Sequence, residues 1–265
     1  MILRLAASLL LAYAVWCALL FLMQDRMLFP AALAGTPGEP FHPRTEVLER
    51  RIDEATTVRA WLIPAAGDGD PAPLLVFFHG NAELIDHQAE LARWYLARGF
   101  TVLLPEYRGY GHSEGRPSQA GIVDDAVHFL DLAAARAEVD GARVVLHGRS
   151  IGGAVAAQVA ARRPATAVVL VSTPVSVAGM AWRVGAPPFL VRNPFRTDTV
   201  LPQLDAPVLL LHGSRDREIP VRHSRRLHEL ARQSRLVEYD AGHNDFPPPD
   251  RWADYWREIE EHIGL

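Results

Sequence analysis

The chain has 265 residues, of which 49% are hydrophobic, so it can bury the core of one large α/β domain or two small ones, and dominant disorder is excluded. Its net charge is −4, with the charged residues spread along the chain, so no basic face indicates a nucleic-acid partner. All 27 basic residues are arginines, and without lysine the chain cannot perform lysine Schiff-base chemistry or form a Walker-A phosphate loop.

The first predicted element is an uncharged apolar segment, residues 5–23. As a helix it would be roughly 28 Å long, close to the thickness of a bilayer core. Arg4 precedes this segment, and Asp25 and Arg26 follow it. We therefore predict a single-pass membrane anchor over residues 1–26. The flanking charges favour, by a narrow margin, a soluble domain on the outer, periplasmic side.

A cleavable signal peptide is the alternative interpretation of this segment. The apolar run of a signal peptide is usually shorter, about 7 to 15 residues, and small residues mark its cleavage site. Here the bulky sequence FLMQ of residues 21–24 follows instead, which favours an uncleaved anchor. Cys17 is the single cysteine, so an internal disulfide and a thiolate metal cluster are both excluded.

The segment after the anchor changes character twice. Residues 27–43 are rich in Pro, Gly and Ala, which is typical of a linker. Residues 46–63 alternate apolar and polar side chains, which predicts antiparallel strands at one edge of a sheet. We expect the folded domain to occupy residues 44–265.

Apolar runs and helical patterns then alternate along the chain. The runs are short and continuous, as in strands buried on both faces, and occupy residues 74–78, 101–104, 143–146, 167–171 and 208–211. Helical spacing recurs between or after them at residues 82–98, 120–137, 151–163 and 221–233. This alternation predicts an α/β fold with a mostly parallel sheet and helices on both faces.

A His-Gly dipeptide ends three of these strands: His79-Gly80, His147-Gly148 and His212-Gly213. The carboxyl ends of parallel strands are where open α/β sheets place their sites. We nevertheless interpret the three histidines as packed side chains beneath tight turns that the glycines permit.

Two serines fit the G-x-S-x-G pattern of a nucleophile elbow: Ser113 in GHSEG and Ser150 in GRSIG. An elbow requires a strand that runs directly into the serine and a helix that starts directly after it. Ser150 meets both requirements, because the strand-like VVLHG precedes it and the small-residue pattern IGGAVAAQ follows it. We predict that Ser150 is the nucleophile.

Ser113 fails the same test. The preceding strand ends near Leu104, polar and glycine residues fill 106–112, and Arg116-Pro117 follows where a helix should already be running. We expect Ser113 to hydrogen-bond within its loop or to help shape the wall of a pocket.

A serine nucleophile needs a base, and the base needs an orienting carboxylate. Asp216 lies in the loop after the run 208–211, and His243 follows a glycine after the strand-like residues 236–239. Glu218 is an alternative acid, but it lies closer to the next helix, whose N-terminus favours an acidic residue in any case. The order serine, acid, histidine predicts a triad of Ser150, Asp216 and His243.

Acyl transfer also needs hydrogen-bond donors for the oxyanion. The backbone N–H of Ile151, directly after the nucleophile, is one predicted donor. The second is the N–H of Asn81, in the loop after the run 74–78. The Asn81 side chain has an alternative role as the cap of the following helix.

The motifs FFHGNAE, EYRGYGHSEGRPS, GRSIGGAVA, HGSRDREIP and AGHND, in this order, resemble the α/β-hydrolase superfamily. More narrowly they resemble a membrane-anchored branch of serine hydrolases that includes acyl-protein thioesterases and serine aminopeptidase-like members. The resemblance covers residues 27–265 and implies an α/β-hydrolase fold. It implies the same triad and the same oxyanion donors: Ser150, Asp216, His243, Asn81 and Ile151. We expect no cofactor and no metal site, because the closest histidine pair, His223 and His228, is five residues apart on a predicted helix and does not share a face well.

Together these features predict a membrane-anchored hydrolase of carboxylic esters or thioesters. A serine aminopeptidase-like peptidase and a non-catalytic binding protein on the same fold are the alternatives. Residues 172–207 are long for a connection and could form a short lid over an acyl chain, or pack as an ordinary crossover. The expected partners are the membrane and an acyl substrate. This substrate is a small molecule, a lipid-like molecule or a lipidated protein.

Overall fold

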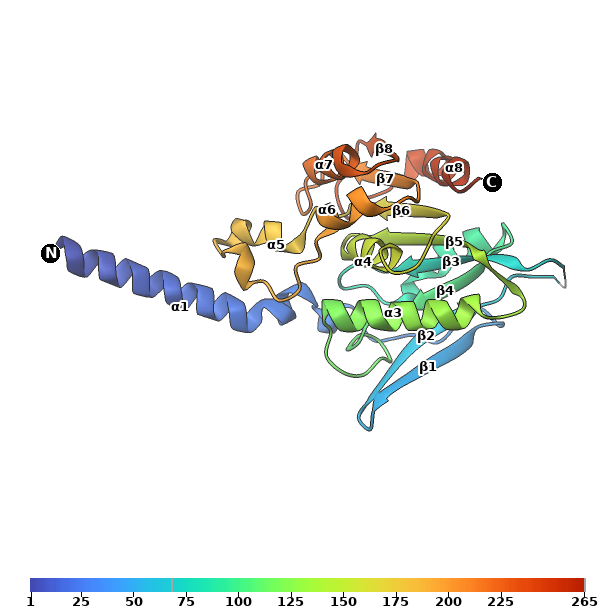
Figure 1. The fold of residues 1–265 in the computed structure, drawn as a ribbon, viewed down its shortest axis with the longest axis horizontal. Coiled ribbons are helices and arrows are strands. Elements are labelled where there is room, and N and C mark those ends of the chain that lie inside the picture. Colours follow the sequence, from blue (N-terminus) through green and yellow to red (C-terminus); the bar gives the residue numbers. More distant parts are fainter. Residues whose placement is uncertain (68, 265) are drawn as a thin grey trace.

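The computed structural model describes residues 1–67 and 69–264, and its centre is an eight-stranded sheet (Figure 1). The strands lie in the order β1-β2-β4-β3-β5-β6-β7-β8. The pairs β1/β2 and β2/β4 are antiparallel, and all other neighbours are parallel. This confirms the mostly parallel sheet with antiparallel strands at one edge. The strands are β1 (Glu46–Asp53), β2 (Thr56–Ile63), β3 (Ala72–Phe78), β4 (Thr101–Pro105), β5 (Val139–Arg149), β6 (Ala167–Val171), β7 (Val208–Gly213) and β8 (Ser234–Tyr239).

The continuous apolar runs place hydrophobic side chains on both faces of the sheet. In β3, Leu74, Val76 and Phe78 belong to one buried cluster, while Leu75 and Phe77 belong to the cluster on the opposite face. This alternation follows from the two-residue repeat of a strand. Each face therefore needs a covering layer of helices.

Helices supply a layer on each face. α3 (Gln119–Ala134), α4 (Ile151–Ala160) and α7 (Arg222–Leu230) contribute to the first cluster, and α2 (Ala89–Leu96) and α8 (Trp252–Ile263) contribute to the second. Figure 1 shows α3 and α4 in front of the sheet. Short 3₁₀ turns flank some helices: η1 (Ala31–Leu33), η2 (Ile85–Gln88) and η6 (Pro249–Arg251).

All four helices expected from the spacing end earlier than predicted; those expected to reach residues 137 and 163 end at Ala134 and Ala160. For the other two the backbone shows the cause of a late start or an early end. The helix expected from residue 82 begins only after Leu84, because Ala82 has a φ of 52° and Leu84 is extended, with a φ of −122°. The helix expected to reach residue 233 ends at Leu230, because Ala231 is extended and Ser234 already pairs with Val208 in the sheet. Local spacing alone carries no information on either event.

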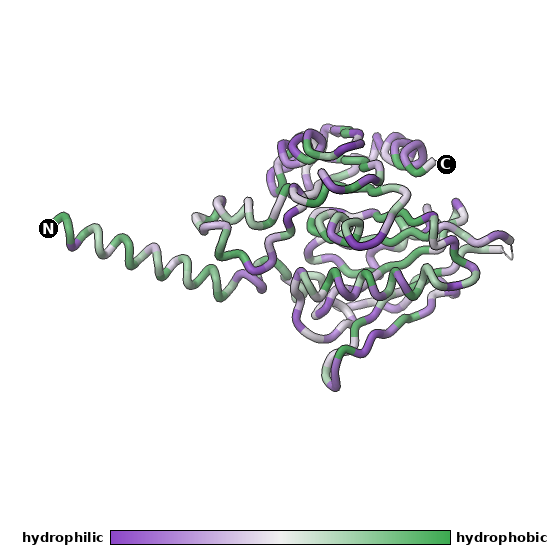
Figure 2. The backbone as a smooth tube through the Cα atoms, in the orientation of Figure 1, coloured by the Kyte–Doolittle hydropathy of each residue, from purple (hydrophilic) through white to green (hydrophobic). Residues whose placement is uncertain are grey.

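The N-terminal helix α1 (Ile2–Leu28) projects away from the sheet (Figure 1). None of its residues is buried, and Figure 2 shows hydrophobic residues along most of its length. Its length and composition are sufficient to cross a membrane. Met27 and Leu28, which the sequence prediction placed in the linker, continue this helix.

The predicted linker of residues 27–43 packs on the domain near its start. Phe29 and Ala34 are buried in the first hydrophobic cluster. The Phe29 ring meets the ring of Phe195 edge to face, with the centroids 6.3 Å apart. The base of α1 is therefore held against the domain by a buried aromatic contact rather than by a loose tether.

Residues 172–207, which we call the lid segment, leave the sheet after β6 and return at β7 through short helical turns. These turns are α5 (Val177–Met180), η3 (Ala181–Val184), η4 (Pro188–Leu190), α6 (Thr197–Val200) and η5 (Leu201–Gln203). Side chains of α1 donate hydrogen bonds to the segment: Tyr13 Oη to the Gly185 carbonyl at 3.0 Å and Trp16 Nε1 to the Val184 carbonyl at 2.9 Å. The lid segment and α1 therefore lie against one another.

Candidate active site

Ser150 occupies a sharp turn between β5 and α4, at the carboxyl end of the sheet. Its φ of 56° and ψ of −123° lie outside the regions that non-glycine residues prefer, as a nucleophile elbow requires. Gly152 fits here because an added Cβ would contact the carbonyl oxygens of Phe78 and His79. Gly148 fits because an added Cβ would contact the carbonyl of Gly152. The glycines thus let helix and strands approach closely around the serine.

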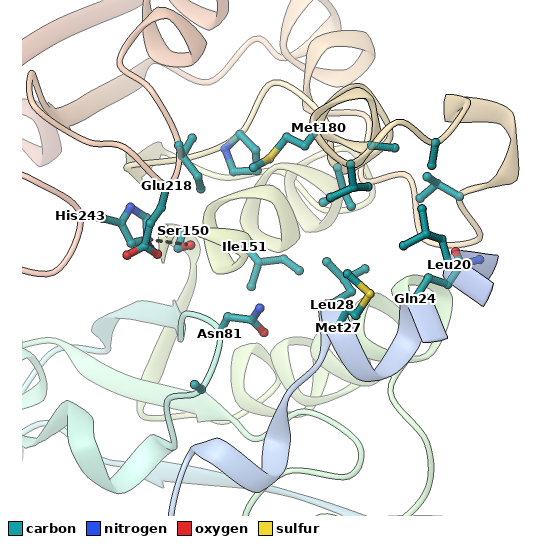
Figure 3. A pocket seen from close by; sticks show the side chains of 18 of the residues that line it. Leu20, Gln24, Met27, Leu28, Asn81, Ser150, Ile151, Met180, Glu218 and His243 are labelled. Atoms are coloured by element: carbon teal, nitrogen blue, oxygen red, sulfur yellow. Dashed lines mark hydrogen bonds and ion pairs between the residues drawn. The ribbon is translucent and has the colours of Figure 1, made fainter. Parts of the chain in front are cut away.

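The three residues of the predicted triad form one hydrogen-bonded row. His243 Nε2 lies 3.2 Å from Ser150 Oγ, and His243 Nδ1 lies 2.6 Å from Asp216 Oδ2. All three residues are buried. Since the carboxylate can only accept, Nδ1 carries the proton and Nε2 is free to accept the serine hydroxyl proton. Figure 3 shows His243 and Ser150 facing one another at one end of a pocket.

Asp216 has a saturated hydrogen-bond environment. Its Oδ1 accepts the backbone N–H groups of Glu218 at 2.9 Å and Ile219 at 2.7 Å, and His212 Nε2 lies 3.3 Å from its Oδ2. Burial alone raises the pKa of Asp216, but hydrogen bonds from His212, His243 and Ile219 outweigh it and hold the pKa below its usual value. The group that orients His243 is therefore a carboxylate at neutral pH.

Glu218 is not placed to replace Asp216. Its Oε2 lies 3.9 Å from Nε2 of His243, on the serine side of the ring, and its side chain is 60% exposed. Its Oε1 accepts a hydrogen bond from Asn244 Nδ2 at 2.8 Å. Glu218 therefore belongs to the rim of the pocket.

The two predicted oxyanion donors come from different parts of the chain: Asn81 lies in the loop after β3, and Ile151 directly follows the serine. Ile151 is the first residue of α4, and within the described residues neither its N–H nor that of Asn81 donates to another protein group. Both residues line the pocket that contains Ser150. The Asn81 side chain does not cap a helix, because its Oδ1 accepts from Tyr110 Oη at 3.1 Å. The two N–H groups thus remain available to a ligand.

Sequence reasoning missed a pair of charged residues beside the triad. The Arg149 guanidinium forms an ion pair with Glu83 and donates to the backbone carbonyl of His243 at 2.9 Å. Glu83 also accepts the N–H of Gly80 at 2.8 Å. These contacts link the loop after β3, the elbow and the histidine loop, so the pair holds the His243 loop against the Ser150 turn. The position of Arg149 within the GRSIG motif is a signal for the arginine, but the sequence carries none for its pairing with Glu83.

Ser113 lies away from this arrangement. It is buried, its hydroxyl donates to the Glu106 carbonyl at 3.2 Å, and it accepts the N–H of Arg59 at 2.9 Å. It does not line the pocket around Ser150. Of the two roles expected for Ser113, the structure places it in the first, as a hydrogen-bonding residue of its loop.

The pocket extends from the triad into an apolar cavity of about 570 Å³. Its far wall is built from α1 and the lid segment (Figure 3). From α1 come Cys17, Leu20, Phe21, Gln24, Met27 and Leu28. The lid segment adds apolar side chains: Pro174, Val177, Met180, Ala181, Val184, Ala186, Leu190 and Val191. The cavity has the size and lining of a small-molecule site.

Known proteins resemble this chain in sequence and in fold. Residues 69–193 match a family described as serine aminopeptidase, S33. The uncharacterised protein YfhR of Escherichia coli K12 is 34% identical over 221 residues, covering 80% of this chain and 78% of YfhR. WAV2 of Arabidopsis thaliana, described as an α/β-hydrolase domain-containing protein, is 31% identical over 273 residues, covering 91% of this chain and 87% of WAV2.

The structure of Est1E from Butyrivibrio proteoclasticus with bound ferulic acid superposes on 82% of this chain and 100% of its own, with a TM-score of 0.69. At 18% sequence identity this similarity concerns the fold alone. YfhR and WAV2, by contrast, match this chain in sequence over most of their own length and most of its length. The chain therefore belongs to the α/β-hydrolase superfamily.

Proposed function

We propose that this protein is a membrane-anchored serine hydrolase that cleaves carboxylic esters or thioesters of apolar acyl groups. One observation carries the proposal: the row Ser150–His243–Asp216 stands at one end of an apolar cavity. A nucleophile, a base and an orienting acid in contact are the requirements of acyl transfer. The apolar lining matches the acyl side of the substrate.

The reaction proceeds through an acyl-enzyme. Ser150 Oγ attacks the substrate carbonyl carbon while His243 Nε2 takes the hydroxyl proton. Asp216 holds the imidazole and stabilises its positive charge. The N–H groups of Asn81 and Ile151 stabilise the oxyanion. His243 then protonates the departing alcohol or thiol, and water, activated by the same histidine, releases the acid.

A peptidase is the second candidate, favoured by one contact. An aminopeptidase must hold the ammonium of its substrate, and the exposed carboxylate of Glu218 lies 3.9 Å from His243 Nε2. Turnover measured in parallel on aminoacyl amides and on acyl esters distinguishes peptidase from esterase activity. If Glu218 binds an ammonium, Glu218→Gln lowers turnover of the aminoacyl amides only.

Membrane anchoring by α1 is part of the proposal, with the domain on the outer side. Support comes from the length and composition of α1 and from the flanking charges of Arg4, Asp25 and Arg26. Protease added to spheroplasts, whose outer membrane has been opened, digests a periplasmic domain and spares a cytoplasmic one, so this experiment decides the orientation.

Covalent labelling by a fluorophosphonate tests the nucleophile. We expect wild type and Ser113→Ala to be labelled and Ser150→Ala to remain unlabelled. Ser113→Ala is the matched control because Ser113 fits the same sequence pattern without contacting a histidine in the described structure. Labelling that persists in Ser150→Ala would overturn the assignment, and an unlabelled wild type would favour a non-catalytic binding protein.

A further inference from the structure

Helix α1 contributes one continuous face to the cavity. The six residues that line it follow the spacing of one side of an α-helix: 17, 20, 21, 24, 27 and 28. Along the axis this face extends roughly 17 Å. A ligand that fills the cavity from Ser150 outward would therefore run alongside the helix that is apolar enough to cross a membrane.

The lid segment is fixed to this helix by polar contacts. Gln24 donates to the Leu190 carbonyl at 3.1 Å and accepts the Arg192 N–H at 2.7 Å, and Asp25 pairs with the Arg192 guanidinium at 3.0 Å. Further out, Tyr13 and Trp16 donate to the carbonyls of the lid segment. Irregular backbone is tolerated at membrane depth only where protein groups satisfy it, and α1 supplies those groups.

The lid segment also exposes large apolar side chains next to α1. Trp182 is 64% exposed and Phe189 is 83% exposed. Only residues 2–12 of the helix extend beyond its contacts with the segment, roughly 17 Å against a hydrocarbon core of about 30 Å. A helix that crosses the bilayer must therefore bring the lid segment into the lipid, where Trp182 and Phe189 have favourable surroundings.

We infer that α1 is a wall of the substrate site and that the substrate is a long acyl chain taken from the bilayer, drawn in along Cys17, Leu20 and Gln24 toward Ser150. This inference rests on the hydrolase activity proposed above. It follows from three observations together: the lining of the cavity, the docking of the lid segment on α1 and the exposed apolar side chains beside them.

Cys17 provides a direct test, because it is the single cysteine and lines the cavity. Full-length protein in detergent micelles is treated with an ethyl or a hexadecyl fluorophosphonate. Ser150 Oγ attacks phosphorus, fluoride leaves, and His243 takes the proton. The rate of Cys17 alkylation by N-ethylmaleimide is then measured. We expect the hexadecyl adduct to slow alkylation at least tenfold and the ethyl adduct to leave it unchanged.

Each other outcome has a definite meaning. If both probes react with Ser150 and neither protects Cys17, the cavity is not the acyl site, while the hydrolase proposal stands. Reaction of the ethyl probe alone has the same meaning. Protection that persists in Ser150→Ala would be an effect of the micelle and overturns the inference. If neither probe reacts with Ser150, the hydrolase proposal fails, and the inference fails with it.

Matched variants of α1 give a second test. Leu20 lines the cavity, whereas Leu22 on the same helix is 73% exposed and does not. We expect Leu20→Trp, reconstituted in phosphatidylcholine vesicles, to lower kcat/KM for a hexadecanoyl ester about tenfold, the effect of displacing one or two methylenes from the site. The kcat/KM for a butanoyl ester should fall by a smaller factor, because its shorter chain occupies less of the cavity, and Leu22→Trp should match wild type for both esters. Equal losses for both esters would contradict the inference.

Discussion

At the scale of single residues, the contacts of Asp216 distinguish an orienting acid from a merely adjacent one. Two backbone N–H groups and His212 bind its carboxylate in addition to His243. The neighbouring acid Glu218 is exposed and touches the opposite side of the imidazole. Changing each carboxylate to an amide therefore separates their roles.

We expect Asp216→Asn to lower kcat for a short-chain ester by about 10⁴, because an amide at this position favours the wrong tautomer of the histidine. Glu218→Gln should cause a far smaller loss, since that carboxylate does not contact Nδ1 of His243. Steady-state kinetics on purified variants in detergent measures both. Similar losses in the two variants would show that Asp216 is not the orienting acid.

His147 affects stability through its burial. Burial lowers the pKa of His147 to about 3, whereas an unfolded histidine titrates near 6.5. As the pH falls below the unfolded value, the unfolded chain gains a proton that the folded chain does not accept, so the folded state loses stability. For this residue the loss between pH 7 and pH 5 is about 2 kcal/mol.

In His147→Gln this contribution is absent. Between pH 7 and pH 5 the free energy of unfolding of the variant should therefore fall by about 2 kcal/mol less than that of wild type. Urea unfolding at pH 7 and at pH 5 measures this change. The packing energy that the substitution removes is the same at both pH values, so it does not affect the difference between them. The exposed His112, changed to Gln, is the control and should keep the wild-type slope. An unchanged slope in His147→Gln would contradict the buried neutral state.

Several of these residue-level features could be predicted from the sequence. Ser150 could be separated from Ser113 because a strand and a helix must flank an elbow, and both are visible as patterns. The ion pair of Arg149 with Glu83 could not, because it depends on β3 and β5 being neighbours in the sheet. No local pattern encodes which strands lie side by side.

At the scale of elements, the strands agree with the sequence prediction more closely than the helices do. The run 167–171 is a strand of the same bounds, β6, since apolar residues on both faces define it. The bounds of α2 and α7 depend on single backbone angles and on pairing with distant strands. Neither the strand pattern nor the helix pattern predicts the short turns of the lid segment, because contacts with α1 hold them in place.

Gln24 should govern the mobility of the lid segment. Its Oε1 accepts the Arg192 N–H and its Nε2 donates to the Leu190 carbonyl, and loss of each such bond is worth about 1 kcal/mol. Because Gln24→Leu removes both bonds, we expect amide hydrogen exchange in residues 185–193 to accelerate about thirtyfold. The control is Gln203→Leu, whose side chain donates to Thr199 within the lid segment. Equal exchange in Gln24→Leu and wild type would mean that the docking is held elsewhere.

At the scale of the whole molecule, the outer part of α1 can be removed without touching the cavity. Residues 2–12 precede every α1 residue that lines it. Their deletion leaves a helix from Tyr13 to Leu28 of roughly 24 Å, shorter than a bilayer core. We expect the truncated protein to become extractable from membranes by alkaline carbonate and to keep its ester hydrolysis in detergent.

Full-length protein in the same extraction should stay in the membrane pellet. A truncated protein that also stays would show that the lid segment and the rest of α1 suffice for membrane binding. The sequence could predict an anchor from its length and apolar content. It could not predict that this helix forms part of a cavity, because that contact joins residues 17–28 to a distant segment, as in the hydrogen bond of Gln24 to Leu190, 166 residues away along the chain.

The position of Ser150, between the exposed rim at Glu218 and the apolar face of α1, has a consequence for the products. If the acyl chain lies along α1 as we propose, the fatty acid would be released next to the bilayer, while the alcohol or thiol would leave on the aqueous side. The two products would then enter different phases and would rarely meet again. Hydrolysis in vesicles should accordingly run closer to completion, with weaker inhibition by added thiol or alcohol, than hydrolysis in a single aqueous phase.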